Sequence, residues 1–491
     1  MAEDRLEEIR NQRLATRQEL LASGHPPYPS EVRRTSRISE LVSQFDDLAK
    51  DGSSVVLVGR IQAIRTHGAI AFADIADESG KIQLQFTEEK LGDRFKGIEH
   101  IDTGDFVEAS GQPVLSKRGE KTILVTEYTF ASKAIRPIPS TWFGLKDVEQ
   151  RSRERELDLL ANPDTKRVFE KRSRVLTFIR NYLTSNGFIE VETPVLQPIA
   201  GGTLAEPFST HHNALDSDLF LRIAPELYLK RLLVGGFEKV FEIGKNFRNE
   251  GVDKSHNPEF TMLEFYQAYA DYEDLMDTAE QIVSSAALEV TGSYEVPWGD
   301  KSISFAAPFD RYSYVELLQE RTGINVLEEK DPAVYIAAFE KHSITPPKTK
   351  TYTKLVDELY KEIVRPTLQN PTILYDYPVE LVPLAKRSLQ DERIAEMFQL
   401  VIAGMEIVKA YTELNDPVEQ RARFEEQQAS RDKGDREAHS IDESYLQAME
   451  YGMPPAAGFG LGVDRLVMLL TNTSHLRDVI LFPLLREQDR S

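Results

Sequence analysis

Two extended segments joined by a polar loop carry the residues best suited to chemistry, within residues 239–272. Side chains on a strand alternate between its two faces, so Phe260, Met262, Glu264 and Tyr266 share one face. A carboxylate on this mixed apolar face has two interpretations. It faces solvent on an edge strand, or it lies in a pocket that receives a cation, because an unpaired buried charge is costly.

The other polar residues of this stretch suit a nucleotide and an anion. Arg248, at the end of the first segment, offers a planar fork that grips carboxylate or phosphate. Phe260 supplies a ring face on which a base can stack. Glu250 and His256 lie in the loop between the segments, which contains turn-forming residues. We therefore expect a long-tipped hairpin that holds a nucleotide and an anion together.

The sequences FRNEG and HNPEFTMLEFYQAYADY in this hairpin resemble motif 2 of the class II aminoacyl-tRNA synthetases, in its lysine-specific form. The resemblance covers nearly all of residues 54–486. It implies an α+β fold, with an N-terminal five-stranded OB-fold barrel and a class II antiparallel sheet flanked by helices. It also implies ATP-dependent ligation of L-lysine to tRNA(Lys) through a lysyl-adenylate, with release of AMP and pyrophosphate, by a homodimer that uses Mg2+.

Composition limits the class of protein and the kind of metal site. The chain has 491 residues, 41% of them hydrophobic, and no apolar run that could span a bilayer. Its N-terminus is charged, so we expect a cytoplasmic protein without a membrane segment. It has no cysteine, which excludes disulfides and thiol catalysis. Its 9 histidines show no spacing typical of metal ligands. Any metal is expected to have oxygen ligands, as Mg2+ does.

A formal net charge of -21 argues against a general nucleic-acid coat protein, because phosphate backbones are bound by Lys and Arg. A local basic patch on an acidic body still permits a nucleic-acid substrate. Overall charge does not decide between these two.

The domain organisation follows from changes in pattern along the chain. Residues 1–53 predict an N-terminal helix and a lead-in, and residues 54–137 predict five short strands of a Greek-key barrel. A proline-containing linker is expected at 138–158, and the catalytic domain at 159–491. The barrel is either a purely structural β-domain or, as the resemblance implies, an anticodon reader. In the latter case Phe72 stacks on a base, with Arg65, Gln83 and Glu120 around it.

Within the catalytic domain the resemblance places three motifs and an insertion. Motif 1, at about 187–202, implies a dimer interface that ends in a Gly-Gly pair lining the amino-acid site. Motif 2 is at about 239–272, and motif 3 at about 458–470. Between motifs 2 and 3, residues 300–370 are expected to form helices that pack without a further role.

Motif 3 contains one charged residue that requires an explanation. Arg465 lies in the first turn of an otherwise apolar helix, where an Arg is kept only with an anionic partner. By resemblance, Arg465 and Arg248 are the catalytic residues. The implied ATP-binding set is Arg248, Glu250, His256, Phe260, Glu406 and Arg465. The implied lysine-binding set is Gly202, Glu226, Arg248, Glu264, Tyr266, Lys409, Tyr411 and Glu413.

A second hairpin, turning near residues 403–404, is expected to place Gln399 beside Glu406. The resemblance implies Mg2+ at this pair, yet the family has Glu where this chain has Gln399, and Asn where it has Lys409. Many relatives also have a basic residue where this chain has Glu206. These departures bear on metal binding and on charge near the substrate.

Two other functions compete with a tRNA ligase. A paralogue that lysylates a protein would resemble the catalytic domain alone, and the barrel argues against it. A non-catalytic tRNA-binding relative is favoured by Gln399 and Lys409. The retained residues that argue against this second alternative are Arg248, Glu250, His256, Glu406 and Arg465.

Overall fold

The structure is a computed structural model, and it describes residues 2–138, 147–203, 205–382, 384–432 and 441–485. The chain divides into two compact units, Met1–Lys146 and Asp147–Ser491. Within the described ranges no helix is long and apolar enough to cross a membrane.

The first unit contains the expected barrel of five strands, closed in the order β1-β2-β3-β5-β4. Side chains along the strands alternate between buried and exposed, as a filled barrel requires. Their inward positions carry apolar residues such as Leu57, Ile75 and Leu84, none of which is accessible to solvent. The strands are β1 (Val55–His67), β2 (Ile70–Ala76), β3 (Lys81–Thr87), β4 (Phe106–Leu115) and β5 (Lys121–Ser132).

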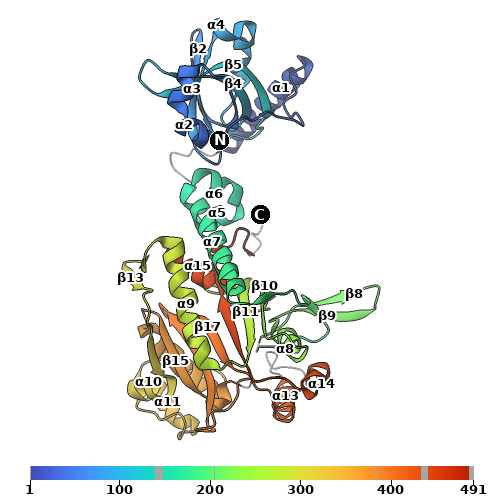
Figure 1. Ribbon diagram of the computed structural model, residues 1–491, viewed down its shortest axis with the longest axis vertical. Helices are drawn as coiled ribbons and strands as arrows, with labels where there is room; N and C mark the ends of the chain where they lie inside the picture. Colours follow the sequence, from blue (N-terminus) through green and yellow to red (C-terminus); the bar gives the residue numbers. More distant parts are fainter. Residues whose placement is uncertain (1, 139–146, 204, 383, 433–440, 486–491) are drawn as a thin grey trace. The chain divides into compact units, whose positions relative to one another are not determined.

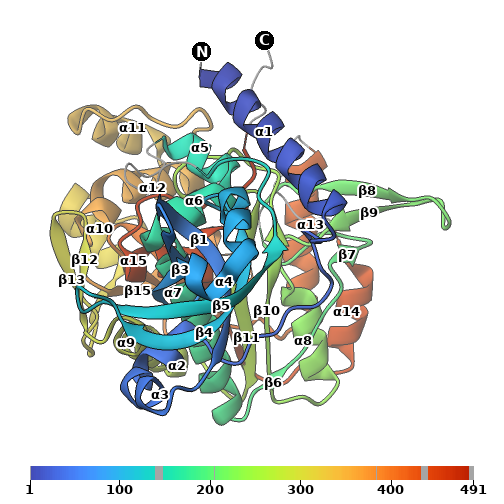
Figure 2. The ribbon, with the colours of Figure 1, turned by 90° about the horizontal axis from the view of Figure 1, so that it is seen from above.

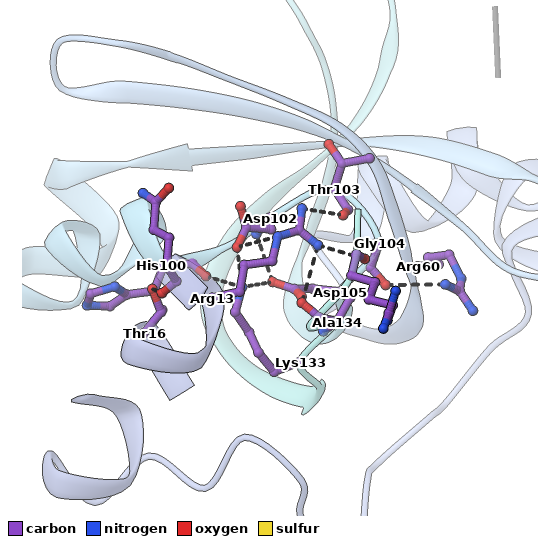
Figure 3. Close-up of polar contacts among 12 residues, drawn as sticks. Arg13, Thr16, Arg60, His100, Asp102, Thr103, Gly104, Asp105, Lys133 and Ala134 are labelled. Carbon is purple, nitrogen blue, oxygen red and sulfur yellow. Dashed lines mark hydrogen bonds and ion pairs between the residues drawn. The ribbon is translucent and has the colours of Figure 1, made fainter. Parts of the chain in front are cut away.

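Short helices surround the barrel, including the expected N-terminal one. They are α1 (Ala2–Ala22), α2 (Ile38–Ser43), α3 (Phe45–Asp51), α4 (Glu88–Leu91) and the 3-10 helix η1 (Gly92–His100). Helix α1 is attached to the barrel through Arg13, which donates to the backbone carbonyls of Thr103, Ala134 and Arg136 (Figure 3).

A buried ion cluster lies beside this attachment, around Lys133 (Figure 3). Its ammonium contacts Asp102 at 2.5 Å and Asp105 at 2.8 Å and donates to the carbonyl of His100 at 2.8 Å. Asp105 also accepts from the backbone amides of Asp102 and Ala134, each at 2.7 Å. Burial raises the pKa of Asp105, and Lys133 opposes that rise.

The second unit is built on an eight-stranded sheet in the order β14-β15-β16-β17-β18-β11-β10-β6 (Figure 1). All neighbouring pairs are antiparallel except β14 with β15 and β6 with β10. The expected class II architecture is therefore confirmed. The strands are β6 (Ile189–Glu190), β10 (Lys239–Phe247), β11 (Glu259–Ala268), β14 (Asp310–Ser313), β15 (Thr372–Pro378), β16 (Ile394–Ile402), β17 (Met405–Thr412) and β18 (Ala456–Gly462).

Helices cover both faces of this sheet, because alternate strand residues point to opposite sides. On one side Phe241, Phe265 and Phe459 share a core with α7 (Pro163–Ser185), α9 (Tyr272–Thr291) and α15 (Val463–Thr471). On the other side Val240, Tyr266 and Tyr411 share a second core with five further helices. These are α8 (Glu226–Val234), α10 (Tyr314–Thr322), α11 (Pro332–Lys341), α12 (Tyr352–Leu359) and α14 (Glu443–Glu450).

The remaining elements lie around this layered body. A hairpin of β8 (Ser209–His212) and β9 (Ser217–Leu221), which also pairs with β7 (Leu196–Gln197), projects beyond the sheet strands (Figure 2). The others are α5 (Val148–Arg153), α6 (Arg155–Ala161), β12 (Glu295–Trp298), β13 (Lys301–Ser304), α13 (Pro417–Asp432), the π-helix η2 (Tyr360–Val364), and the 3-10 helices η3 (Arg365–Thr367), η4 (Val379–Leu381) and η5 (Leu476–Val479).

The region 300–370 is not purely helical, contrary to expectation. Its first part contains β13, and β14 pairs with β15 in the main sheet. The apolar alternation of these four-residue strands is too short to separate from the helical pattern that follows.

Candidate active site

A cavity of about 460 Å³ opens on the sheet face that carries Glu264. Its walls come from β11, β17 and β18, the start of α8 and α15, and the loop between β10 and β11. The predicted site residues that line it are Gly202, Glu226, Arg248, Glu250, His256, Phe260, Glu264, Tyr266, Gln399, Glu406, Lys409, Tyr411 and Arg465. Segments more than 200 residues apart therefore meet at one place.

Strand parity explains the position of Glu264. The β10–β11 hairpin pairs Glu242 with Glu264 across the strands, and the alternate β11 residues Phe260, Met262 and Tyr266 line the cavity with it. Glu264 is only 6% exposed, which excludes the solvent-facing interpretation. Burial, reinforced by the nearby Glu226, raises the pKa of Glu264 to about 8. A cation entering the cavity would restore its charge.

Arg248 keeps an unused donor in the cavity. Its Nε is buried without a hydrogen-bond partner among the described residues, and its guanidinium lies 5.0 Å from the ring centroid of Phe260. Burial lowers the pKa of Arg248, whereas Glu250 and Glu264 raise it. A buried donor that is left unpaired carries a desolvation cost, which an anionic ligand would remove.

Arg465 enters the cavity from the first turn of α15. It donates to the backbone carbonyl of Glu406 at 2.9 Å, and its other nitrogen lies 3.4 Å from Nε2 of His256. His256 in turn contacts Asp253 through Nδ1 at 2.9 Å. No carboxylate ion pair with Arg465 is found in the described parts of the chain, so its charge is open to an anion. The anionic partner expected for Arg465 therefore stays a prediction.

Asp464 is a cavity residue that the sequence did not reveal. It forms an ion pair with Arg172 at 2.6 Å and accepts from the backbone amide of Thr261 at 2.9 Å. These contacts fix the start of α15 against β11 and so orient Arg465. In the sequence, the position of Asp464 next to Arg465 in an apolar helix was the signal that could have identified it.

A second unforeseen residue, Lys230, does not line the cavity but contacts Glu226, which does. Its ammonium is fully buried between Glu226, at 2.5 Å, and Glu413, with which it also forms an ion pair. Tyr411 donates to the same oxygen of Glu226 at 2.8 Å. Glu413 itself does not line the cavity, unlike the other predicted site residues, because it lies behind Gly458. The spacing of four residues between Glu226 and Lys230 was the sequence signal.

Two glycines make this arrangement possible. A Cβ at Gly458 would lie 2.5 Å from Cε1 of Tyr266 and closer still to Oε1 of Glu413. Gly202 has a φ of +98°, and a Cβ there would lie 2.9 Å from Cβ of Glu226. Bare backbone thus allows the carboxylates to approach. The GFGLG pattern places glycines 458, 460 and 462 on one face of β18, and this period of two was the missed clue.

The second hairpin corrects one prediction. A β-bulge between Leu400 and Val401 shifts the register, so Gln399 pairs with Lys409, while Glu406 pairs with Val401. The expected position of Gln399 beside Glu406 is therefore wrong: the two residues do not pair across the strands, and the bulge leaves Ile407 of β17 without a partner on β16. Both side chains still line the same cavity.

The donor set at this end fits Mg2+ only in part. The amide oxygen of Gln399 accepts from Tyr377 at 2.9 Å, which leaves Glu406 as the charged oxygen ligand. Within the described ranges no group of three acidic, His or Cys side chains converges on one point. One carboxylate with substrate phosphates is nevertheless a usual protein contribution to Mg2+ binding.

Helix α12 also reaches the cavity, beyond the packing role expected for it. Lys354 and Asp357 on α12 and Lys361 just after it lie among the lining residues, and Lys361 contacts Asp357 at 2.6 Å. Successive positions of a helix face explain this placement. The insertion therefore forms part of the wall of the site.

On the barrel, three of the four predicted residues lie on the neighbouring strands β1, β2 and β3, and Glu120 directly precedes β5. Arg65 on β1 pairs with Phe72 on β2, which is half-buried. Gln83 on β3 donates to the Glu120 carboxylate at 2.9 Å and accepts from Thr122 at 3.0 Å. The arrangement provides one ring face with polar groups nearby. Its role as an anticodon site remains a proposal.

With this geometry in place, the comparisons with known proteins identify the class. The family model of class II tRNA synthetases for D, K and N matches residues 147–486, and the OB-fold nucleic acid binding domain matches residues 55–131. The chain belongs to this class II tRNA synthetase family. It is 46% identical to a lysine–tRNA ligase of Carboxydothermus hydrogenoformans over the whole of both chains. It is also 47% identical to those of Chloroflexus aurantiacus, over 98% of this chain and 99% of the relative, and of Roseiflexus castenholzii, over 99% and 100%.

Proposed function

We propose that this chain is a lysine–tRNA ligase, which activates L-lysine with ATP and transfers it to tRNA(Lys). One cavity contains both Glu264, a buried carboxyl whose pKa is raised to about 8, and Arg248, whose Nε has no hydrogen-bond partner among the described residues. This combination is the observation that carries the proposal. A cationic side chain and a carboxylate are the two features that distinguish free lysine from apolar amino acids. A pocket whose carboxylates need a cation rejects apolar amino acids strongly.

The first step forms a bond between a lysine carboxylate oxygen and the α-phosphorus of ATP, and breaks the bond to the pyrophosphate leaving group. No covalent enzyme intermediate is needed, so positioning and electrostatics carry this step. Arg248 lies where it can hold both reacting anions, with Phe260 placed under the base. Arg465 and His256 face the polyphosphate from α15 and the loop.

The second step transfers the lysyl group from the adenylate to the terminal ribose of the tRNA. The 3′ hydroxyl oxygen attacks the carbonyl carbon and its proton is released, while the bond from this carbon to the AMP oxygen breaks and AMP leaves with the bonding electron pair. Mg2+ bound through Glu406, with Gln399 nearby, would supply positive charge on the phosphates.

The surroundings of the reaction complete the proposal. Phe72, with Arg65, Gln83 and Glu120, reads the anticodon by stacking and polar contacts on the barrel. The enzyme acts as a homodimer in the cytoplasm. The lysine site comprises Gly202, Glu226, Glu264, Tyr266, Lys409, Tyr411 and Glu413 together with Arg248.

The test is lysine-dependent exchange of labelled pyrophosphate into ATP, followed by lysylation of tRNA. We expect exchange with lysine and none with norleucine, its neutral analogue. Arg248→Lys should reduce exchange on the order of a hundredfold, because a point charge cannot replace the planar fork. The matched control is Arg231→Lys, since Arg231 contacts Tyr228 and Ser444 away from the cavity. Absence of exchange in the wild type would leave a non-catalytic tRNA-binding relative. Exchange without tRNA lysylation would point to the paralogue.

A further inference from the structure

Lys230 is a buried cation that the reaction as described does not use. Its side chain has no exposed surface, and both of its ion-pair partners belong to the proposed lysine site. Burial lowers its pKa, but Glu226 and Glu413 raise the pKa of Lys230 well above the ordinary value. It is therefore a permanent ammonium inside a pocket that must receive another ammonium. A bystander with that charge would repel the substrate.

The contacts of Lys230 leave one oxygen of each carboxylate unused. Lys230 and Tyr411 both contact Oε1 of Glu226, so its Oε2 is the oxygen still available. Lys230 contacts Oε2 of Glu413, and Oε1 of Glu413 lies next to the bare backbone of Gly458. Neither oxygen of Glu413 has a hydrogen bond of good geometry within the described chain. One ammonium thus holds two carboxylates, of which Glu226 borders the cavity with one oxygen available and Glu413 lies behind Gly458.

We propose that Lys230 is a positioning residue for lysine recognition, which bridges Glu226 and Glu413 and sets the charge of the pocket to suit a substrate with two ammonium groups. This inference rests on the proposed function. Three carboxylates, those of Glu226, Glu264 and Glu413, converge on the amino-acid end, and Lys230 neutralises one of them. The remaining two negative charges match the α- and ε-ammonium groups of lysine. The substrate carboxylate is left to Arg248.

Lys230 also controls ionisation of its partners. Burial raises the pKa of Glu413 to about 8, Lys230 opposes that rise, and Glu226 adds to it. Without the ammonium, the two buried carboxylates would share a proton, as like charges in close contact do. The groups that face this cluster are Glu226 on α8, Glu264 and Tyr266 on β11, Tyr411 on β17, Glu413 after β17, Tyr445 on α14 and Asp442 at the N-cap of α14.

The pH dependence of lysine binding separates this role from a structural one. In the wild type, the KM for lysine should fall as pH rises and level off above about 8, where Glu413 is ionised. In Lys230→Met the pKa of Glu413 rises further, so the KM should be at least about tenfold higher at pH 7. The ratio of the variant KM to the wild-type KM should then fall between pH 8 and pH 9.5. Titration of lysine itself cancels in this ratio.

The experiment measures lysine-dependent pyrophosphate exchange for the wild type, Lys230→Met, Lys230→Gln and Lys230→Arg. Lys230→Gln is the second neutral variant and should show the same pH trend if Lys230→Met does not fold. Lys230→Arg keeps the charge and should give a KM ratio that does not vary with pH. Calorimetry of lysine binding at pH 9 in two buffers should show about one more proton released by the neutral variants than by the wild type.

A matched control exists in the other unit, where Lys133 is equally buried between two carboxylates. Lys133→Met should lower stability but leave the KM for lysine and the proton count unchanged. The proposal is overturned by a pH-independent KM ratio in both neutral variants, or by the same profile in Lys133→Met. No lysine-dependent exchange in the wild type would instead overturn the proposed function.

Discussion

The two units each contain a fully buried lysine between two carboxylates, and the two clusters differ in what remains unpaired. Around Lys133 the ammonium also donates to a backbone carbonyl, and both oxygens of Asp105 accept backbone amides. Around Lys230 neither oxygen of Glu413 has a well-formed hydrogen bond within the described residues, and Glu226 keeps one oxygen available. The first cluster is complete as folded.

This difference offers a rule for reading buried charge. Leaving a buried acceptor without a donor costs free energy, so a folded protein tolerates it where a ligand later supplies the donor. The Lys133 cluster holds helix α1 and β5 to the barrel and needs nothing further. The Lys230 cluster borders the cavity through Glu226 and Tyr411, and we propose that a cationic substrate completes it. Charge and burial alone do not distinguish the two.

The strongest test of this comparison is Asp105→Asn in the Lys133 cluster of the barrel. Removing one partner of a buried ion pair costs about 3 kcal/mol here, because Asp102 still contacts Lys133. Denaturant unfolding should show this loss in the first unit, with the KM for lysine unchanged. An increase in the KM for lysine would mean that the barrel cluster also contributes to substrate binding.

Gly458→Ala should have the next largest effect, now on activity. Its Cβ would collide with Tyr266 and with the oxygen of Glu413 that Lys230 leaves free. We expect lysine-dependent exchange to fall about a hundredfold. Gly80→Ala is the control, since its Cβ would lie 3.5 Å from Ile38, an ordinary contact. Near-normal exchange by Gly458→Ala would show that Glu413 need not occupy that position.

Glu264→Gln tests a buried carboxylate for which no ion pair is found within the described parts of the chain. A charge-assisted contact is worth roughly 1.5 to 3 kcal/mol, so lysine activation should fall on the order of tenfold to a hundredfold while ATP binding survives. Steady-state exchange at varied lysine and varied ATP separates the two. Glu280→Gln on α9, which affects the ion pair of Glu280 with Arg311 on β14, should alter neither. Wild-type kinetics for Glu264→Gln would remove this residue from the lysine site.

Phe72→Ala tests whether the barrel binds a ligand on its surface rather than in its buried cluster. Loss of a stacking platform should weaken use of tRNA by about 1 to 3 kcal/mol and leave adenylate formation intact. Aminoacylation at varied tRNA, beside pyrophosphate exchange without tRNA, measures both. An equal fall in the two activities would argue against an independent anticodon reader.

The smallest effect is expected at the proposed Mg2+ site, for Lys409→Asn alone and for Lys409→Asn combined with Gln399→Glu. These residues face each other across β16 and β17. The ammonium of Lys409 can supply positive charge that a weaker Mg2+ site lacks, so Lys409→Asn should raise the magnesium requirement and slow adenylation. Adding Gln399→Glu should restore part of the rate. Adenylation measured against magnesium concentration decides this, and strictly additive defects would exclude compensation.

Local pattern was enough to predict the barrel and the motif 2 hairpin. Alternation along β11 identified Glu264 as a carboxylate on a buried face, and turn residues marked the strand ends. The register of β16 and β17 could not be predicted, because a single extra residue on β17, Ile407, shifts every pair farther from the turn. Lys230 was hidden for a different reason. A lysine in the middle of a helix usually faces solvent, and only packing of β17 and α14 against α8 encloses it.

The glycine face of β18 limits how the specificity of this pocket can change. Gly458, Gly460 and Gly462 form its floor, between the strand that carries Glu264 and the strand that carries Tyr411. Every other amino acid adds at least one carbon there, and at Gly458 that carbon has no room. Variation at Gly458 is therefore closed to evolution and to protein engineers alike, whereas a Cβ at Gly462 would meet only ordinary contacts at 3.8 Å or more. A pocket for a shorter or uncharged amino acid would have to come from exchanges in the walls, at positions such as Glu226, Tyr266 and Tyr411.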